Sequence, residues 1–308
     1  MKKLKQKRIW TVIAGGVVAI AIAGGTYLYA SQGDRSASNI ITAQSSQGNS
    51  QINRQYQVET REIFYESNGN RIFGLARIPQ GAGRVPTVIF AHGFGANHDQ
   101  EELIQKSLAS NGIAVYTIDF AGGTGDNGRS EGEMINMSVL TEQQNLQEAL
   151  KIMKKQSFVD TNNIFLLGAS QGGVVSSLTA VANSNQVRGV ALLYPAFSLF
   201  DDAHERFRSE SAIPNTYNLM GLTVGRRYFE DIWNIEIFNA ISKYKGPVTI
   251  FHGTDDNIVP YSYAERASRT FPHATLTTVE NAGHGFSASE QSQIANQLVD
   301  FVNNHKNN

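Results

Sequence analysis

From residue 56 to the C-terminus, short apolar runs alternate with stretches whose apolar residues recur at helical spacing. The runs are rich in branched residues and have turn residues at their ends, which is typical of strands buried on both faces of a sheet. The five clearest runs are VPTVIFAHG, GIAVYTIDF, NIFLLGAS, VRGVALLYPA and GPVTIFHG. The alternation predicts an α/β fold with a mostly parallel central sheet and helices on both faces.

Segments on either side of this core complete the predicted fold. VETREIFYES and NRIFGLARIP are two expected strands joined by a turn at residues 67–70, which predicts an antiparallel hairpin at one margin of the sheet. Helices are expected around residues 99–110, 138–156 and 288–304, and a last strand at residues 274–284. Residues 197–245 exceed an ordinary connection in length, so we predict an inserted cap subdomain over the functional site.

The N-terminal residues indicate export. Residues 1–8 form a basic flank, and residues 9–30 then contain no charged residue. An apolar stretch of this length can cross a bilayer as a helix, and the basic flank would remain in the cytoplasm. The stretch is longer than the core of a typical cleaved signal peptide, which favours a single-pass cell-membrane anchor with the body of the chain extracellular. The alternative is a cleaved signal peptide and a secreted protein.

The remaining composition limits the classes of function. Residues 31–55 are rich in Ser, Gln and Asn and are expected to form a flexible linker before one domain at residues 56–308. That domain is mildly acidic, so no nucleic-acid partner is expected. The chain has no cysteine, which excludes disulfides, a cysteine nucleophile and thiolate metal sites. No pair of histidines has ligand spacing, so neither a metal nor a cofactor is expected.

Ser170 is the candidate nucleophile. It lies in Gly168-Ala169-Ser170-Gln171-Gly172, directly after an apolar strand and directly before an expected helix. A sharp strand-to-helix turn with this G-x-S-x-G pattern exposes the serine hydroxyl above the sheet. The second match to the pattern contains Ser130, but it lies in a polar, glycine-rich loop. We therefore predict that Ser130 is a turn residue.

Asp256 and His284 are the candidate partners of Ser170. A serine hydroxyl needs a base that is itself oriented by a carboxylate, and the expected chain order is Ser, then Asp, then His. Both residues follow apolar strands, at the edge where Ser170 also lies. We prefer Asp256 to its neighbour Asp255, which is expected to be solvated or to cap its loop. His252 is expected to hydrogen-bond loop backbone instead of acting as the base.

Two backbone amides are candidates for an oxyanion hole. One is the N–H of Gln171, immediately after the nucleophile. The other is the N–H of Phe94 in His92-Gly93-Phe94-Gly95, where the flanking glycines let the backbone approach a substrate closely. The alternative for this segment is a plain glycine turn.

Residues 56–305 resemble the α/β-hydrolase superfamily, and within it the bacterial cinnamoyl (feruloyl) esterases. The resemblance rests on His92-Gly93-Phe94, Asp119-Phe120, Gly125 to Gly132, Met137 to Leu140, Ser170 to Gly173, Pro195-Ala196, His252 to Asp256, and Gly283-His284 with Phe286. It implies the α/β-hydrolase fold with a cap that covers an aromatic acyl group, which fits residues 197–245. It also implies that Asp202 in the cap meets a phenolic hydroxyl. The alternative for Asp202 is a solvated surface carboxylate.

These residues predict a serine carboxylesterase that acts through an acyl-enzyme on small acyl or aryl esters, hydroxycinnamoyl esters among them. A membrane-anchored serine peptidase or amidase is the main alternative, because amide hydrolysis uses the same acyl transfer. A ligand-binding scaffold without catalysis and a cofactor-free peroxidase with the same triad are further alternatives. The expected partner is a small-molecule ester.

Overall fold

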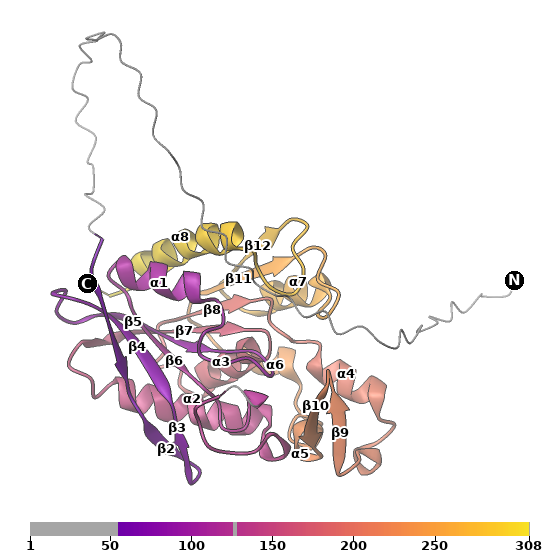
Figure 1. The fold of residues 1–308 in the computed structure, drawn as a ribbon. Helices are drawn as coiled ribbons and strands as arrows, with labels where there is room; N and C mark the ends of the chain where they lie inside the picture. The colour runs from indigo at the N-terminus through magenta and orange to yellow at the C-terminus, as the bar shows by residue number, and fades with distance from the viewer. Residues whose placement is uncertain (1–54, 126–127, 308) are drawn as a thin grey trace, which may run out of the picture. The chain divides into compact units, whose positions relative to one another are not determined.

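The apolar runs form one eight-stranded sheet in the computed structural model, which describes residues 55–125 and 128–307 (Figure 1). The order across the sheet is β1 (Val58–Glu62), β4 (Gly74–Pro79), β6 (Ala114–Ile118), β5 (Val85–Ala91), β7 (Val159–Ala169), β8 (Gly189–Leu193), β11 (Val248–Gly253) and β12 (Ala274–Val279). The strands from β6 to β12 are mutually parallel, whereas β4 runs antiparallel to both of its neighbours. The sheet confirms the predicted fold class.

The N-terminal hairpin is present, but its strands are not continuous. Its tip is made by β2 (Tyr65–Ser67) and β3 (Asn70–Ile72), which pair across a turn in which Asn68 has φ 52° and Gly69 has φ 76°. Those positive φ angles match the twist of a tight hairpin. The expected long strands break at Phe73, whose N–H donates to Ser130 Oγ (2.8 Å) and whose carbonyl accepts from Asp119 N–H (3.0 Å). Hydrogen bonds to the loop after β6 therefore replace cross-strand hydrogen bonds of the hairpin at Phe73.

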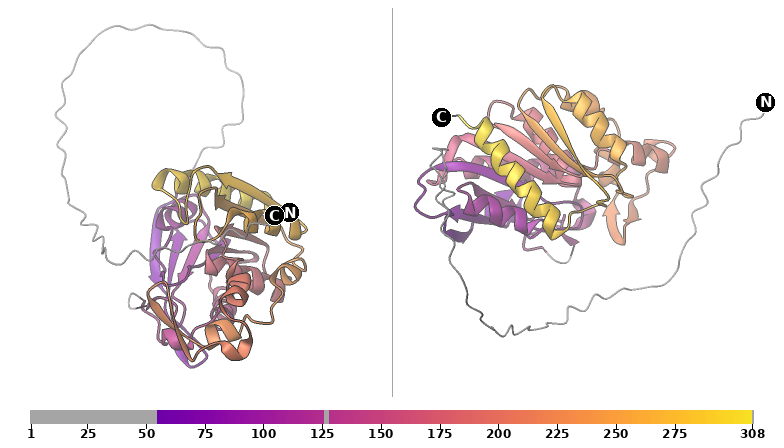
Figure 2. Two further views of the ribbon diagram at one scale, coloured as in Figure 1. Left: turned by 90° about the vertical axis from the view of Figure 1, so that its right-hand side faces the viewer. Right: turned by 90° about the horizontal axis from the view of Figure 1, so that it is seen from above.

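Helices cover both faces of the sheet, as predicted. On one face α1 (Glu102–Ser110) and α8 (Ala288–His305) pack together over a core that includes Ile104, Leu108 and Leu298. Figure 2 shows α8, in yellow, lying across this face. The helices of the other face, which close a second core, are α2 (Val139–Met153), α3 (Gln171–Ala182) and α7 (Tyr261–Thr270).

The chain between β8 and β11 forms the predicted insert. It contains α4 (Leu199–Arg206), β9 (Thr216–Leu219), β10 (Leu222–Gly225), α5 (Arg227–Glu230) and α6 (Ile237–Ile241). Strands β9 and β10 form a separate antiparallel hairpin, which lies beside the main layers with α4 and α5 (Figure 1). Helix α6 packs against α3 and α7, so the projecting part of the insert ends before α6. A short 3₁₀ turn at Met134–Asn136 contacts β10 and α5.

Within residues 55–125 and 128–307, no helix combines the length and apolar character needed to cross a bilayer. The predicted basic flank at residues 1–8 and the apolar segment at residues 9–30 lie outside the described residues. So does the predicted linker at residues 31–55, apart from its last residue.

Helix α2 begins with a reciprocal cap that also contacts the insert. Ser138 Oγ accepts from the Thr141 N–H (3.2 Å), and Thr141 Oγ1 accepts from the Ser138 N–H (2.9 Å). Ser138 Oγ also donates to Asp231 Oδ2 (2.5 Å), just after α5. Such a cap satisfies backbone donors that the first helical turn leaves without partners.

We expect Ser138→Ala to lower the free energy of unfolding by about 1–2 kcal/mol, because it removes a buried N-cap. Urea denaturation followed by circular dichroism measures the change. Ser287→Ala, in the exposed capping box of α8, is the matched control and should cost less. Equal losses at the two sites would contradict a special role for the link between α2 and the insert.

Candidate active site

Ser170 lies at a strained turn between β7 and α3. Its φ of 51° and ψ of −120° are rare for a residue with a side chain, and strain of this kind persists only where surrounding structure imposes it. The two flanking glycines explain the turn. A Cβ on Gly168 would lie 2.2 Å from Gly172 O, and a Cβ on Gly172 would lie 2.1 Å from Ala91 O. The G-x-S-x-G pattern is thus required by close packing of α3 against the ends of β7 and β5.

The structure brings Ser170, His284 and Asp256 into one hydrogen-bonded chain. Ser170 Oγ lies 2.8 Å from His284 Nε2, and His284 Nδ1 lies 2.8 Å from Asp256 Oδ2. The three residues follow β7, β12 and β11, at the carboxyl ends of parallel strands. The carboxylate is fully buried, while 14% of the imidazole remains exposed. A chain of this kind can take a proton from the hydroxyl and stabilise the imidazolium that results.

Asp256 is held ionised by its surroundings. Its burial acts to raise the pKa, but hydrogen bonds from His252, His284 and the Val259 N–H outweigh burial and hold the pKa well below its usual range. Asp256 Oδ1 accepts the N–H groups of Ile258 and Val259 at 2.9 Å each.

The structure also distinguishes Asp255 from Asp256, and His252 from His284, by their contacts. Asp255 is exposed and its side chain accepts only from Thr254 Oγ1 (3.3 Å) among the described residues. His252 Nε2 lies 3.0 Å from Val259 O and 3.1 Å from Asp256 Oδ2. His252 therefore contacts loop backbone, as expected, and in addition braces Asp256.

The predicted oxyanion amides lie beside Ser170. A Cβ on Gly93 would be 3.0 Å from Ser170 Cβ, so the loop after β5 passes directly against the serine. The N–H of Gly93 donates to Gln100 Oε1 (2.7 Å), and the N–H of Gly95 donates to Gly123 O (3.0 Å). Between them, the Phe94 N–H has no protein acceptor within the described residues. Nor has the N–H of Gln171, the first residue of α3.

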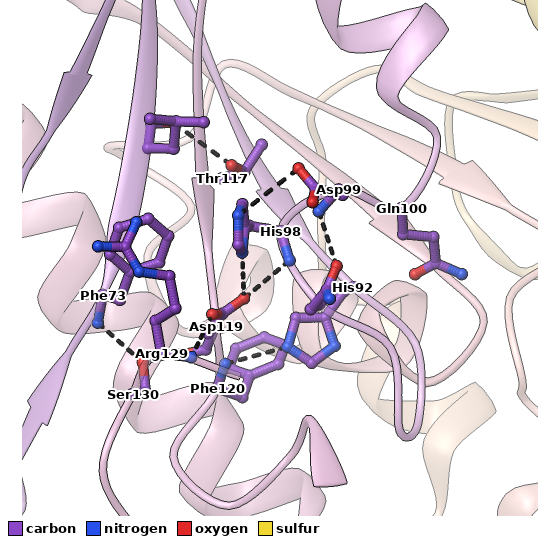
Figure 3. Close-up of polar contacts among 12 residues, drawn as sticks. Phe73, His92, His98, Asp99, Gln100, Thr117, Asp119, Phe120, Arg129 and Ser130 are labelled. Carbon is purple, nitrogen blue, oxygen red and sulfur yellow. Dashed lines mark hydrogen bonds and ion pairs between the residues drawn. The ribbon is translucent and has the colours of Figure 1, made fainter. Parts of the chain in front are cut away.

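A buried network supports the loop that carries Phe94 (Figure 3). Asp119 Oδ1 accepts both the N–H and Nδ1 of His98 at 2.8 Å, and Oδ2 accepts the Arg129 N–H at 2.8 Å. Burial acts to raise the pKa of Asp119, but these hydrogen bonds outweigh burial and lower the pKa. Partial burial acts to lower the pKa of His98, but its interaction with Asp119 outweighs burial and raises the pKa. His92 is neutral, because burial lowers its pKa to about 4, and its Nε2 accepts the Phe120 N–H (3.0 Å).

Ser130 is a structural residue of this same network. Its hydroxyl donates to Asp119 O (2.6 Å) and accepts the Phe73 N–H (2.8 Å), and among the described residues it forms no hydrogen bond with His98. Both interactions fix the loop after β6 against β4. The second G-x-S-x-G match is therefore a turn, as predicted.

Three residues that support His284 and the loop after β5 were missed by sequence reasoning. The ring of Tyr194 packs edge-on against the His284 ring at 4.8 Å, and its hydroxyl donates to the buried carboxylate of Glu101. Gln100 Nε2 reaches the same hydroxyl at 3.4 Å while Gln100 Oε1 holds the Gly93 N–H. The backbone of Glu101 is left-handed, with φ 58°. No local pattern marks these residues, because they meet only through the fold.

The insert lies over the oxyanion loop. A Cβ on Gly95 would be 2.7 Å from Leu222 Cδ1, and the ring of Tyr228 packs edge-on against Phe94 at 5.6 Å. Asp202 lies on α4 in the insert, half-buried, and accepts Ser198 Oγ (2.9 Å). Burial raises the pKa of Asp202. Within the described residues, Asp202 forms no hydrogen bond or ion pair with Ser170, His284 or Asp256.

Within the residues that the structure describes, no group of three or more His, Cys, Asp or Glu is arranged to hold a metal ion. The side chains of Ser170, His284 and Asp256 are instead joined to one another. The arrangement around Ser170 is suited to nucleophilic attack with an acid–base histidine.

Comparisons with known proteins match the chain to two family models and to several relatives of low identity. A family model described as serine aminopeptidase, S33 matches residues 84–221, and one described as TAP-like protein matches residues 234–307. Monoacylglycerol lipase ABHD6 of Mus musculus is 23% identical over 264 residues, 71% of this chain and 76% of the lipase. The uncharacterized peptidase YtmA of Bacillus subtilis is 23% identical over 252 residues, 79% of this chain and 92% of the peptidase.

Solved structures extend the likeness to three dimensions. Est1E from Butyrivibrio proteoclasticus, with ferulic acid bound, superposes with a TM-score of 0.72 at 21% identity and covers 79% of this chain and 98% of its own. Acetyl xylan esterase from Paenibacillus sp. R4 gives 0.63 at 17% identity, over 84% and 86% of the two chains. At these identities the likeness concerns the fold.

We expect Ser130→Ala to lower the free energy of unfolding by about 1–3 kcal/mol, because it leaves the Phe73 N–H and the Asp119 carbonyl without their partner. Ser170→Ala should change it by less than ~1 kcal/mol, since that hydroxyl bonds only the part-exposed His284 among the described residues. Urea midpoints of the two variants test the distinction. A larger loss for Ser170→Ala would contradict it.

Proposed function

Because the chain is an α/β hydrolase, we propose that it is a serine esterase that hydrolyses small acyl or aryl carboxylic esters. The observation that supports this most strongly is the chain of two 2.8 Å contacts from Ser170 Oγ through His284 to Asp256. A serine hydroxyl is a weak nucleophile unless a positioned base removes its proton. The strained turn at Ser170 presents the hydroxyl to such a base.

In the proposed mechanism, Ser170 Oγ attacks the ester carbonyl carbon while His284 Nε2 takes the hydroxyl proton. Asp256 stays ionised, keeps the proton on His284 Nδ1 and stabilises the imidazolium. His284 then gives its proton to the leaving alcohol, and the acyl group remains on Ser170. A water molecule attacks this acyl-enzyme with His284 again as the base, which releases the acid and restores Ser170.

The negative charge that develops on the carbonyl oxygen would be stabilised by the N–H groups of Phe94 and Gln171. Both amides lie beside Ser170 and have no protein acceptor within the described residues. Donors that are fixed before the reaction need no reorganisation when the charge forms, and each contributes roughly 10²–10³-fold in kcat. The close packing of Gly93 against Ser170 supports this role.

We further propose an acyl pocket beside Ser170 that accepts aromatic groups, those of hydroxycinnamoyl esters among them. The ring of Tyr228, from the insert, packs against the ring of Phe94, and the similar Est1E has been solved with ferulic acid. Asp202 on α4 would accept a hydrogen bond from a phenolic hydroxyl.

Peptide or amide hydrolysis is the second candidate. The model that matches residues 84–221 is described as a serine aminopeptidase, and YtmA is described as a peptidase. The acyl-transfer steps would be the same, with His284 protonating a leaving amine. We favour esters because the similar solved structures include Est1E and an acetyl xylan esterase.

We also propose that residues 9–30 anchor the protein in the cell membrane with the hydrolase domain outside, a secreted form being the alternative. The uncharged length of the segment and its basic flank support this placement. Fractionation of cells that express the full chain tests it. Recovery of the protein in the membrane fraction, with the domain accessible to added protease, is expected; a shortened chain in the medium would support secretion.

We expect Asp256→Asn to lower kcat toward a 4-nitrophenyl ester by about 10⁴-fold, because the amide favours the unproductive imidazole tautomer. Ser170→Ala should leave less than ~1% of the rate. Asp255→Asn is the matched control and should keep wild-type activity, because Asp255 is exposed. Initial-rate measurements decide this, and a Ser170→Ala variant with near wild-type activity would overturn the esterase proposal.

We expect methyl ferulate to be hydrolysed with a higher kcat/KM than methyl cinnamate, which lacks the phenolic hydroxyl. Asp202→Asn should reduce this preference by about 10–100-fold, the value of one hydrogen bond to a charged group. Asp201→Asn, one residue away on α4, serves as the control. A parallel assay with short peptides tests the amide alternative. Unchanged discrimination in Asp202→Asn would remove Asp202 from the acyl pocket.

A further inference from the structure

Glu142 on α2 is a buried carboxyl group that the proposed mechanism does not use. Only 1% of the residue is exposed. Its Oε2 accepts Gln171 Nε2 at 2.8 Å, whereas its Oε1 has no partner among the described residues. Within residues 55–125 and 128–307, no Lys or Arg forms an ion pair with Glu142. A buried carboxyl with one amide partner and no counter-charge calls for an explanation.

Glu142 contacts residues that hold both proposed oxyanion donors in place. Its partner Gln171 carries one of the two N–H groups. Its other oxygen packs against Gly123, where a Cβ would lie only 2.7 Å from Oε1. Gly123 in turn accepts the N–H of Gly95 (3.0 Å), which fixes the loop directly after Phe94. One carboxyl group therefore lies between the two backbone segments that would bind the oxyanion.

Tyr228, from the insert, completes the arrangement. Its hydroxyl donates to Gln171 Oε1 at 2.6 Å, so both ends of the Gln171 amide are engaged. Its ring packs edge-on against Phe94. The Gln171 side chain is thus oriented by a donor from the insert and an acceptor from α2. Rotation of that side chain would break both hydrogen bonds at once.

The groups around Glu142 offer no positive charge. Burial raises the pKa of Glu142 to about 8, and the hydrogen bond from Gln171 offsets only part of this effect. The titratable neighbours are His92, at the end of β5 near Gly123, and Tyr228 on α5. Burial lowers the pKa of His92 to about 4 and raises the pKa of Tyr228, so both are neutral at pH 7.

We propose that Glu142 is a positioning residue for both oxyanion donors and that it works as a neutral carboxylic acid. The proposal rests on the esterase function above. The neutral acid accepts the Gln171 amide without placing charge near the substrate. The ionised form would put a poorly solvated negative charge beside the site where the oxyanion develops, and the two would repel each other. Alkaline pH should therefore lower kcat and leave KM nearly unchanged.

The test compares kcat and KM from pH 6 to pH 9.5 for the full-length wild type, Glu142→Gln and the control Glu148→Gln, with 4-nitrophenyl acetate as substrate. Glutamine keeps the shape of the neutral acid and cannot ionise. Glu148 lies on the same helix at the surface, paired with Lys151. The wild type and Glu148→Gln should lose kcat by at least ~10-fold between pH 7 and 9.5, whereas Glu142→Gln should lose less than ~2-fold.

An alkaline fall of the same size in Glu142→Gln, or no fall in the wild type, would overturn the proposal while leaving the esterase function intact. A wild type without activity on any ester would instead overturn the proposed function, and with it the role of Glu142 at the oxyanion. A change confined to KM would also contradict positioning of the oxyanion donors.

Stability gives a readout that is independent of activity. The pKa of Glu142 is raised on folding, so the stability contributed by its neutral form is fully present below the pKa of the unfolded carboxyl and is lost as pH rises through the folded pKa. The urea midpoint of the wild type, measured relative to that of Glu142→Gln, should therefore fall between pH 5 and about 8. At higher pH the difference between the two midpoints should stay constant. A difference between the two midpoints that stays constant over the whole pH range would show that Glu142 is not held neutral.

Discussion

The contact of α3 with the end of β5 is the constraint on which the rest of the site depends. A residue with a Cβ cannot replace Gly172, because that atom would lie 2.1 Å from the Ala91 carbonyl. This approach places the first turn of α3 beside the loop that follows β5. The loop that carries Phe94 also lies against Ser170, whose strained backbone has φ 51° and ψ −120°. A looser junction would separate Ser170 from both amides.

Two buried acids near Ser170 are held in opposite charge states by the same physics. Asp256 receives hydrogen bonds from two histidines and two backbone amides, which repay the cost of burying its charge. Glu142 receives one amide hydrogen bond, and burial dominates. The number of donors, rather than depth alone, separates a carboxylate that orients a base from an acid that stays neutral.

Much of this could be predicted from the sequence. The apolar runs defined the strands because burial on both faces leaves few polar positions within them, and the glycines around Ser170 identified the turn. The hairpin was predicted as well, but its break at Phe73 was not, because the competing partners are Ser130 and Asp119, far along the chain. The pairing of Asp119 with His98 was hidden for the same reason, although both residues follow apolar strands.

The sequence by itself determined the alternation of strands and helices, the strand-to-helix turn at Ser170 and the chain order of Ser170, Asp256 and His284. These features are local, since they depend on periodicity and on which residues follow a strand. Only the tertiary structure decided that Asp256 rather than Asp255 faces His284, and that Glu142 and Tyr228 meet Gln171. Those contacts join segments that are distant in sequence, and their geometry is set by how the layers and the insert pack.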